Sequence, residues 1–428
     1  MNSAPALSLS SIALAVGLLL LAPLALAGLA LINAGLGRSR SAAQSMLGSL
    51  AIATASFLGF ALVGATLAAP ALGPGHTILL SGKVWSWAGT GPWMLSGFAN
   101  LPAKAQLGTL FEMLAVALAA LIPWGSGADR FRIAAGVAVA CVLAGVVFPL
   151  LAHWEWGGGW LGALGEQFGL GTGLLDPGGA ASVHVLGGFA ALSVIWIAGP
   201  RRGKFPRQGL STAMPGHNAN YVLFGCLVAL VGGLAFNMAG ALLWVDLDPT
   251  RLPLVAVNTL LASAAALCAS FTITRLRFGK PDASLCANGW LSGLVVSSAC
   301  AATVTPMQSV FAGLVAGIAT PLLVEVLELA LSIDDPSGAL SAHVVSGLWG
   351  LFVAGVFSHR PGQLIAQLVG IATLLGIVLP FVYLLFVLLN HVVPFRVDPD
   401  GERIGMDLHE LGGAAYPEFV VHRDDSYR

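Results

Sequence analysis

Charged residues are scarce in this chain. Asp, Glu, Lys and Arg make up 9% of its 428 residues, and hydrophobic residues make up 57%. A soluble globular protein carries roughly 25% charged residues, so this composition excludes a soluble enzyme and a nucleic-acid-binding protein. The 19 basic and 20 acidic residues leave a net charge of -1, which indicates no polyanionic partner. The composition predicts that most of the surface faces a lipid bilayer.

Cysteine is also scarce, with five residues, all inside apolar runs: Cys141, Cys226, Cys268, Cys286 and Cys300. Their odd number and wide spacing match neither a disulfide framework nor a paired metal site. We interpret them as small buried hydrophobic residues, and we expect no metal or other cofactor.

Long apolar runs are abundant. A membrane span needs about 20 mainly apolar residues, and eleven stretches qualify: 9–36, 51–72, 108–124, 133–152, 180–199, 220–241, 253–274, 284–304, 309–331, 339–357 and 363–389. The first has no basic segment before it, and Arg38 and Arg40 follow it, so we interpret it as a span rather than a signal peptide. Each span is expected to be an α-helix, because lipid offers no partner to backbone amides.

The few basic residues are sorted by loop. With eleven spans and the N-terminus outside, 15 of the 19 basic residues fall inside; the exceptions are Lys83, Lys104, Arg251 and Arg360. The positive-inside rule therefore predicts a multi-pass protein of the cell membrane with a cytoplasmic C-terminus. We expect a transmembrane domain over residues 1–389 and a cytoplasmic tail over 390–428.

Two histidine-bearing segments repeat each other. Asp176-Pro177-Gly178-Gly179-Ala180-Ala181-Ser182-Val183-His184-Val185 matches Asp335-Pro336-Ser337-Gly338-Ala339-Leu340-Ser341-Ala342-His343-Val344 at eight offsets, counting Gly188 and Gly347 beyond the histidines. The predicted topology places Asp176 at the outer side and Asp335 at the inner side, so the two copies run in opposite directions. This predicts an all-α membrane protein with inverted halves of five spans (about 9–199 and 220–357) and one extra span, 363–389.

Each Asp precedes a proline, which is typical of a helix N-cap followed by Pro at the first helical position. A role in attracting cations stays open, more so for Asp176 because it faces the outer entrance. Each His follows eight residues later, about 12 Å into the membrane. A symmetric pair of imidazoles at that depth favours a pathway for a small neutral molecule or a proton.

The chain resembles the ammonium transporter family, the Amt, Mep and Rhesus proteins, as a divergent bacterial-type member. Beside the two histidine segments, the resemblance rests on these motifs: Pro23-Leu24-Ala25-Leu26, Gly35 through Arg38, Ala152 through Leu161, Pro215-Gly216-His217-Asn218, Phe236-Asn237, Ala287-Asn288-Gly289, Asp334-Asp335-Pro336, Gly405-Met406-Asp407-Leu408 and Ala415-Tyr416. It covers nearly all eleven spans.

The resemblance implies a homotrimer with one pore in each subunit and no enzymatic activity. It implies an outer vestibule that recruits ammonium on the face of Trp156, worth roughly 0.5–2 kcal/mol as a cation–π contact, with Asp176 nearby. A phenylalanine gate, matched by Phe236, follows, and then the twin histidines His184 and His343. The tail resembles tails that receive a PII-type signalling protein.

Several positions depart from the family pattern. The second gating phenylalanine falls at Ala115, and Phe111 lies one helical turn outward on the same face. The vestibule serine falls at Gly240 or Ala241, and a glutamine beside the gate becomes Glu112. For Glu112, an interfacial residue and a cation-attracting residue both stay open. Glu155, between vestibule tryptophans, adds another carboxylate.

Three functions follow as hypotheses. The leading one is an ammonium/ammonia transporter or channel for nitrogen uptake, which deprotonates the cation and passes ammonia, with or without the proton, along a hydrophobic pore. The alternatives are an ammonium sensor with little or no conduction, and a channel for neutral gas or methylamine, for which Ala115 would open room at the gate.

Overall fold

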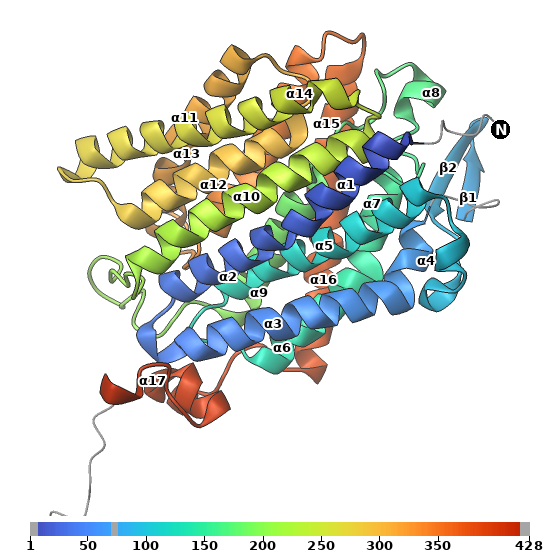
Figure 1. Cartoon of the computed structure of the whole chain (residues 1–428). Helices are drawn as coiled ribbons and strands as arrows, with labels where there is room; N and C mark the ends of the chain where they lie inside the picture. Colours follow the sequence, from blue (N-terminus) through green and yellow to red (C-terminus); the bar gives the residue numbers. More distant parts are fainter. Residues whose placement is uncertain (1–6, 70–75, 420–428) are drawn as a thin grey trace, which may run out of the picture.

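The computed structural model describes residues 7–69 and 76–419. Within these ranges, eleven helical stretches are long and apolar enough to cross a membrane. They lie side by side as one bundle (Figure 1), and each corresponds to one of the eleven predicted spans. The predicted number and order of the spans are therefore confirmed.

The first half of the bundle contains five spans. They are formed by α1 (Leu9–Leu21) with α2 (Pro23–Leu36); α3 (Ala42–Gly59) with α4 (Ala65–Ala68); α5 (Ala103–Ser126); α6 (Ile133–Val142) with α7 (Phe148–Glu155); and α9 (Leu186–Ala198), which continues the π-helical segment Ala180–Val185. The hairpin β1 (His76–Leu80) and β2 (Lys83–Ala88) and the short α8 (Leu164–Phe168) lie in the connections.

The second half contains five more spans: α10 (Ala219–Trp244), α11 (Leu252–Phe278), α12 (Ala283–Cys300), α13 (Pro306–Leu329), and α14 (Ser346–Phe357), which continues the π-helical segment Leu340–Val345. The eleventh span is α15 (Gln363–Thr373) with α16 (Leu379–Val392), and α17 (Pro399–Ile404) follows it.

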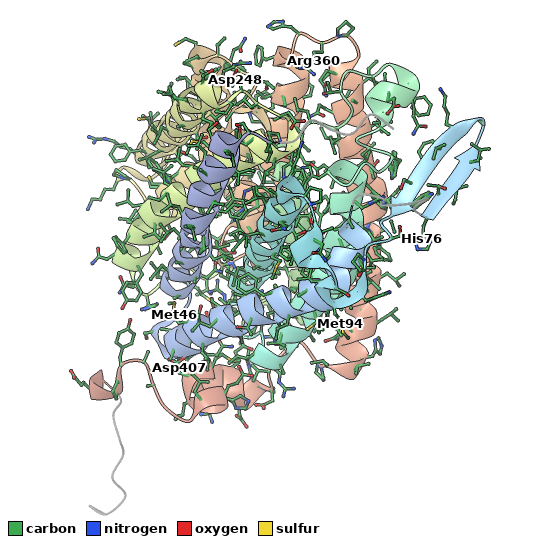
Figure 2. The ribbon with its side chains drawn as sticks, turned by 45° about the vertical axis from the view of Figure 1, so that its right-hand side comes forward. Met46, His76, Met94, Asp248, Arg360 and Asp407 are labelled. Carbon is green, nitrogen blue, oxygen red and sulfur yellow. The ribbon has the colours of Figure 1, made fainter. Side chains whose placement is uncertain are left out.

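The bundle has two distinct ends. We call the end that carries β1, β2 and α8 the hairpin end, and the end that carries α17 the tail end (Figure 1). Figure 2 shows Asp248 and Arg360 at the hairpin end and Asp407 at the tail end. Asp407 accepts hydrogen bonds from the backbone N–H groups of Ala43 and Gln44, the latter at 2.7 Å. The segment around Asp407 is therefore fastened to the start of α3.

Reciprocal packing shows the inverted repeat. A Cβ atom added at Gly188 would collide with Val344, and one added at Gly347 would collide with Val185. Gly188 and Gly347 are equivalent positions of the repeat, and so are Val185 and Val344, so each glycine meets the valine of the other copy. Glycine at both places lets the two histidine-bearing helices cross at close range, as a two-fold relation between the halves requires.

Two expectations were wrong in detail. The second span begins at Ser39, not at residue 51. Its polar first turns are helical because Gln44 and Ser45 bond other elements: the Gln44 amide donates to the Phe131 carbonyl, and the Trp124 indole donates to the Ser45 carbonyl. Of the cysteines, Cys141 and Cys268 are exposed. A thiol behaves as a small apolar group, so it suits a surface that faces hydrocarbon.

Candidate functional site

The two repeat histidines meet in the bundle interior. Their Nδ1 atoms lie 3.1 Å apart, and their ring centroids are 5.2 Å apart with an interplanar angle of 19°. His184 is 8% exposed and His343 is 5% exposed. One Nδ1 must donate and the other accept, so the rings hold complementary tautomers, and each Nε2 has the opposite role to its own Nδ1. The pair can therefore offer a passing molecule both a donor and an acceptor.

A narrow cavity of about 30 Å³ adjoins the pair. His184, His343 and Phe236 line it, and its remaining lining is mainly apolar. A cavity needs roughly 10–15 Å³ of such volume to hold one water, so this one accommodates only very small molecules. An apolar wall disfavours a bare ion and tolerates a neutral polar molecule.

The repeat aspartates cap the histidine helices, although not in the expected register. The two carboxylate oxygens of Asp176 accept from the backbone N–H groups of Ala180 and Ala181, each at 2.6 Å. The helix begins at Ala180, three residues after Pro177, so Pro177 is not its first helical residue. Burial raises the pKa of Asp176, and the neighbouring Glu155 side chain and the backbone hydrogen bonds oppose this shift.

The second copy repeats this geometry. Asp335 accepts from the backbone N–H of Leu340 at 2.9 Å and also from the Ser126 hydroxyl at 2.8 Å. Gly179 and Gly338, three residues after each Asp, both have positive φ angles, 82° and 67°. Glycine tolerates this conformation best, so the turn between Asp and helix depends on it in both halves.

The side chains of Phe111 and Phe236 pack against each other in the bundle interior. Their ring centroids are 5.1 Å apart at an interplanar angle of 75°. Phe111 is fully buried and also touches Trp156 and Trp244 edge-on. Ala115 is fully buried and does not line the histidine cavity. Phe111 therefore packs directly against Phe236, and its role as a gate stays a prediction.

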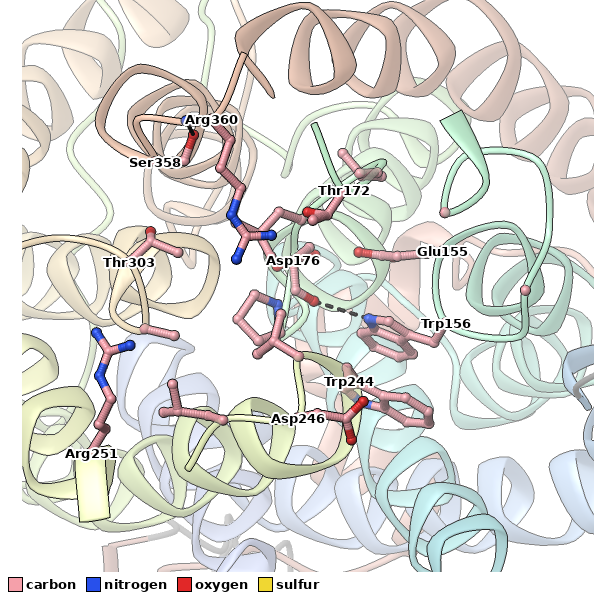
Figure 3. Close-up of a pocket in the computed structure, with 18 residues that line it drawn as sticks. Glu155, Trp156, Thr172, Asp176, Trp244, Asp246, Arg251, Thr303, Ser358 and Arg360 are labelled. Atoms are coloured by element: carbon pink, nitrogen blue, oxygen red, sulfur yellow. Dashed lines mark hydrogen bonds between the residues drawn. The ribbon is translucent and has the colours of Figure 1, made fainter. Parts of the chain in front are cut away.

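A larger pocket of about 530 Å³ opens at the hairpin end. We call it the hairpin-end pocket, and Figure 3 shows its lining. Trp156 and Trp244 form part of its wall and stack in parallel, with centroids 5.2 Å apart and an interplanar angle of 4°. The Trp156 indole N–H donates to the Asp176 carbonyl at 3.0 Å, which fixes its orientation.

Comparison with known proteins agrees with this architecture. The model of the Ammonium Transporter Family matches residues 12–416. The chain belongs to the ammonium transporter family. It is 34% identical to ammonium transporter Amt2 of Archaeoglobus fulgidus, over 92% of this chain and 85% of that one. It is 29% identical to Amt2 of Haloferax mediterranei, over 92% and 87%.

Solved structures of the family share the fold. A protein described as a sensor Amt protein superposes with a TM-score of 0.83 at 25% identity, over 94% of this chain and 98% of that one. Mep2 of Candida albicans superposes with a TM-score of 0.78 at 23% identity, over 96% and 91%. The predicted resemblance and fold class are confirmed, and the family is one of transporters and channels, not enzymes.

Against the pattern expected for an ammonium transporter, the hairpin-end pocket differs in its aromatic wall. Trp244 covers one face of Trp156, so the cation–π surface expected of Trp156 is reduced. The sequence reasoning missed Trp244, although it lies at the end of the same span as Phe236 and only eight residues further on. That spacing is about 2.2 helical turns, which leaves the two residues about 80° apart around the helix and within one broad stripe.

The missing vestibule hydroxyl has a structural reason. A Cβ atom at Gly240 would overlap the Pro177 carbonyl oxygen, so a serine does not fit there unless the Asp176–Pro177 segment moves. Ala241 is fully buried. Glu112 is 7% exposed and does not line the hairpin-end pocket, unlike Trp156 and Asp176.

A charged cluster holds the tail end together. Arg201 donates to Asp334 through its backbone N–H, Nε and Nη2 at 2.8, 3.0 and 2.9 Å, and it approaches Asp129 at 3.3 Å. The fully buried Arg130 lies 3.7 Å from Asp334 and donates to the Gly199 carbonyl. This cluster ties together the connections that follow α5, α9 and α13, and the sequence reasoning used Asp334 only as part of a motif.

Proposed function

We propose that this protein transports ammonium/ammonia across the membrane and that His184 and His343 line its pathway. The observation that supports this most directly is the imidazole pair, joined at 3.1 Å in a narrow, mainly apolar cavity. Its relatives are named as ammonium transporters. The cavity suits a molecule the size of water with both donor and acceptor capacity, and ammonia is such a molecule.

The proposed pathway separates charge from the neutral molecule. The cation enters the hairpin-end pocket and gives up a proton near Phe111 and Phe236. The ammonia then crosses the histidine cavity, and the proton either returns to the solvent of the pocket or passes along the pore separately. This order follows from solvation, because an unpaired cation in an apolar cavity is far more costly than a neutral amine. Asp176 orders the start of its helix by capping and contributes negative charge beside the pocket when ionised.

We propose that the hairpin end faces outward and the tail end faces the cytoplasm. The sorting of basic residues supports this orientation. A homotrimer and a PII-type partner at residues 390–428 are further proposals; the segment around Asp407 packs against α3 and could present such a surface. Pull-down with the organism's own PII protein, repeated across nucleotide conditions, tests the partner, and failure under all of them would remove it.

The two alternatives receive less support. The likeness to a sensor Amt protein supports the sensor hypothesis, in which the protein binds ammonium but does not conduct it. The relatives in sequence, however, are named as transporters. A wider gate for methylamine was suggested by Ala115, but Ala115 is fully buried and Phe111 packs against Phe236. Methylammonium that competes as strongly as ammonium would favour the wider gate.

Proteoliposomes test the proposal. Wild-type protein should give an ammonium-evoked current, or ammonia-driven alkalinisation, that scales with protein at two lipid-to-protein ratios. His184→Ala should fold normally but change flux or selectivity, because it removes half of the imidazole pair. His76→Ala, at the exposed start of β1, is the matched control. Wild-type flux in His184→Ala would refute a pore role, and silence of the wild-type protein would refute conduction.

A further inference from the structure

Glu155 is a buried carboxylate whose oxygens have no hydrogen-bond partner among the described residues. It is the last residue of α7, is 6% exposed, and lines the hairpin-end pocket beside Trp156. Both Oε1 and Oε2 are inaccessible to solvent and unpaired. Figure 3 shows Glu155 next to Asp176 in the pocket wall. A buried ionised carboxylate without a partner is strongly unfavourable, so this group calls for a proton or a cation.

The other acidic groups of the pocket are already paired. Asp176 uses both carboxylate oxygens on backbone N–H groups, and Asp246 forms an ion pair with Lys104 at 2.5 Å. Arg251 and Arg360 also line the pocket. Both are exposed, and neither makes an ion pair with Glu155 in the described structure. Glu155 is therefore the pocket carboxylate with acceptor capacity to spare.

Ser182 supplies a second free acceptor. Its side chain is fully buried, and its hydroxyl has no partner in the described structure. The Glu155 carboxyl group lies close to the Ser182 hydroxyl and the Asp176 carboxyl group, although neither contact has hydrogen-bond geometry. Ser182 precedes His184 by two residues in the same π-helical segment. Ser182 therefore links the neighbourhood of Glu155 to the helical segment that carries His184.

These groups match the chemistry of one ligand. An ammonium ion has four N–H donors and a positive charge, whereas the two Glu155 oxygens and Ser182 Oγ are three acceptors, and Glu155 contributes one negative charge when it is ionised. A charge-assisted hydrogen bond contributes about twice as much as a neutral one. An alkali cation of similar size has no N–H group to direct toward these atoms, so the arrangement favours a hydrogen-bonding cation.

We propose that Glu155, together with Ser182, is the ligand of the transported cation in the hairpin-end pocket and a determinant of its affinity. The pocket has no hydroxyl group at Gly240, and Trp244 covers one face of Trp156. The Glu155 carboxylate takes the place of these two missing cation contacts. This inference rests on the proposed transport function. The inference goes beyond the transport function because it assigns the recognition of ammonium to residues outside the histidine pair.

The decisive variant is Glu155→Gln, which has the shape of a protonated glutamic acid. If Glu155 is a cation ligand, the KM of the ammonium-evoked current should rise roughly tenfold or more, because a hydrogen bond to a charged group is lost. If Glu155 is a permanently protonated wall residue, Glu155→Gln should keep the wild-type KM, and that result would overturn the proposal.

Controls separate charge, folding and function. Glu166→Gln removes the same charge from an exposed position in α8, on the same end of the molecule, and should leave the KM unchanged. Ser182→Ala should raise the KM less than Glu155→Gln does. If Glu166→Gln raised the KM as much as Glu155→Gln does, the effect would come from the general surface charge, and the proposed site would be refuted. Loss of all current in wild type would refute the transport function instead.

Where Glu155→Gln gives no measurable current, binding replaces flux as the readout. Ammonium is titrated while the fluorescence of the Trp156–Trp244 stack is recorded, and a Trp244→Phe sample gives the background from the other tryptophans. The titration should show weaker binding in Glu155→Gln than in wild type. Equal affinity of the two proteins would overturn the proposal. Potassium chloride at the same ionic strength should leave the signal nearly unchanged, and an equal response would contradict selection by hydrogen bonding.

Discussion

Asp334→Asn should destabilise the protein markedly while leaving its shape nearly unchanged. Asp334 is 1% exposed and accepts three hydrogen bonds from Arg201 alone. Asparagine is isosteric, but it removes the charge and turns one acceptor oxygen into an N–H₂ donor. That donor would face guanidinium N–H groups, which are donors as well.

The magnitude follows from what is left behind. Removing one partner from a buried ion pair costs about 3–5 kcal/mol, since the remaining charge stays buried. Here Arg201 keeps its 3.3 Å contact with Asp129, and the asparagine oxygen retains part of the hydrogen bonding. We therefore expect the free energy of unfolding to fall by about 3 kcal/mol, the lower end of that range.

Equilibrium unfolding in detergent micelles, followed by tryptophan fluorescence, measures this difference. The matched control is Asp400→Asn, because Asp400 pairs with Arg403 at 3.5 Å with both side chains largely exposed, 86% and 73%. Exposed pairs contribute about 0–1 kcal/mol, so Asp400→Asn should be close to neutral. If Asp334→Asn lies within about 1 kcal/mol of that control, the cluster does not stabilise the tail end as argued.

Two other predictions concern the hairpin end and pH. Gly240→Ser should lower both the flux and the midpoint of thermal unfolding, because the new Cβ atom would overlap the Pro177 carbonyl oxygen. Gly145→Ser is the control, since a Cβ atom at Gly145 meets open space. Unchanged flux in Gly240→Ser would refute the predicted collision. Burial acts to raise the pKa of Asp334, but hydrogen bonds from Arg201 and the charge of Arg130 outweigh it and hold this pKa below the ordinary 3.8. A lowered carboxyl pKa stabilises the fold above the ordinary pKa, and this stabilisation is lost as pH falls through the lowered one. The stability gap between wild type and Asp334→Asn should therefore be constant from pH 7 to about pH 5 and shrink below about pH 4; a gap that narrows already at pH 6 would contradict it.

The membrane architecture could be predicted because the bilayer constrains sequence strongly. A helix that crosses hydrocarbon needs a long apolar run, and all eleven runs became spans. The prediction failed at the start of the second span, where Gln44 and Ser45 appeared too polar to belong to it. Their hydrogen bonds to Phe131 and Trp124 are tertiary, and a hydropathy pattern has no access to them.

The histidine pair could be predicted for a different reason. The repeat around His184 and His343 carries its own symmetry, and the alternation of spans makes the two copies antiparallel, so their meeting at mid-depth follows from the chain alone. The caps were only partly predicted. Asp176 and Asp335 do bind helix starts, but the turn through Gly179 and Gly338 shifts each helix start beyond the proline.

By itself, the sequence determined the solvent, the spans, the inverted halves and the histidine pair, because each follows from composition, run length or an internal repeat. Only the tertiary structure decided the chemistry of the hairpin-end pocket. The stacking of Trp244 on Trp156, the Pro177 carbonyl against Gly240 and the unpaired oxygens of Glu155 depend on the angles at which separate helices meet. The scarcity of charge is visible in the sequence. The identity of the carboxylate that stays unpaired in the folded protein, in contrast, depends on its neighbours in three dimensions.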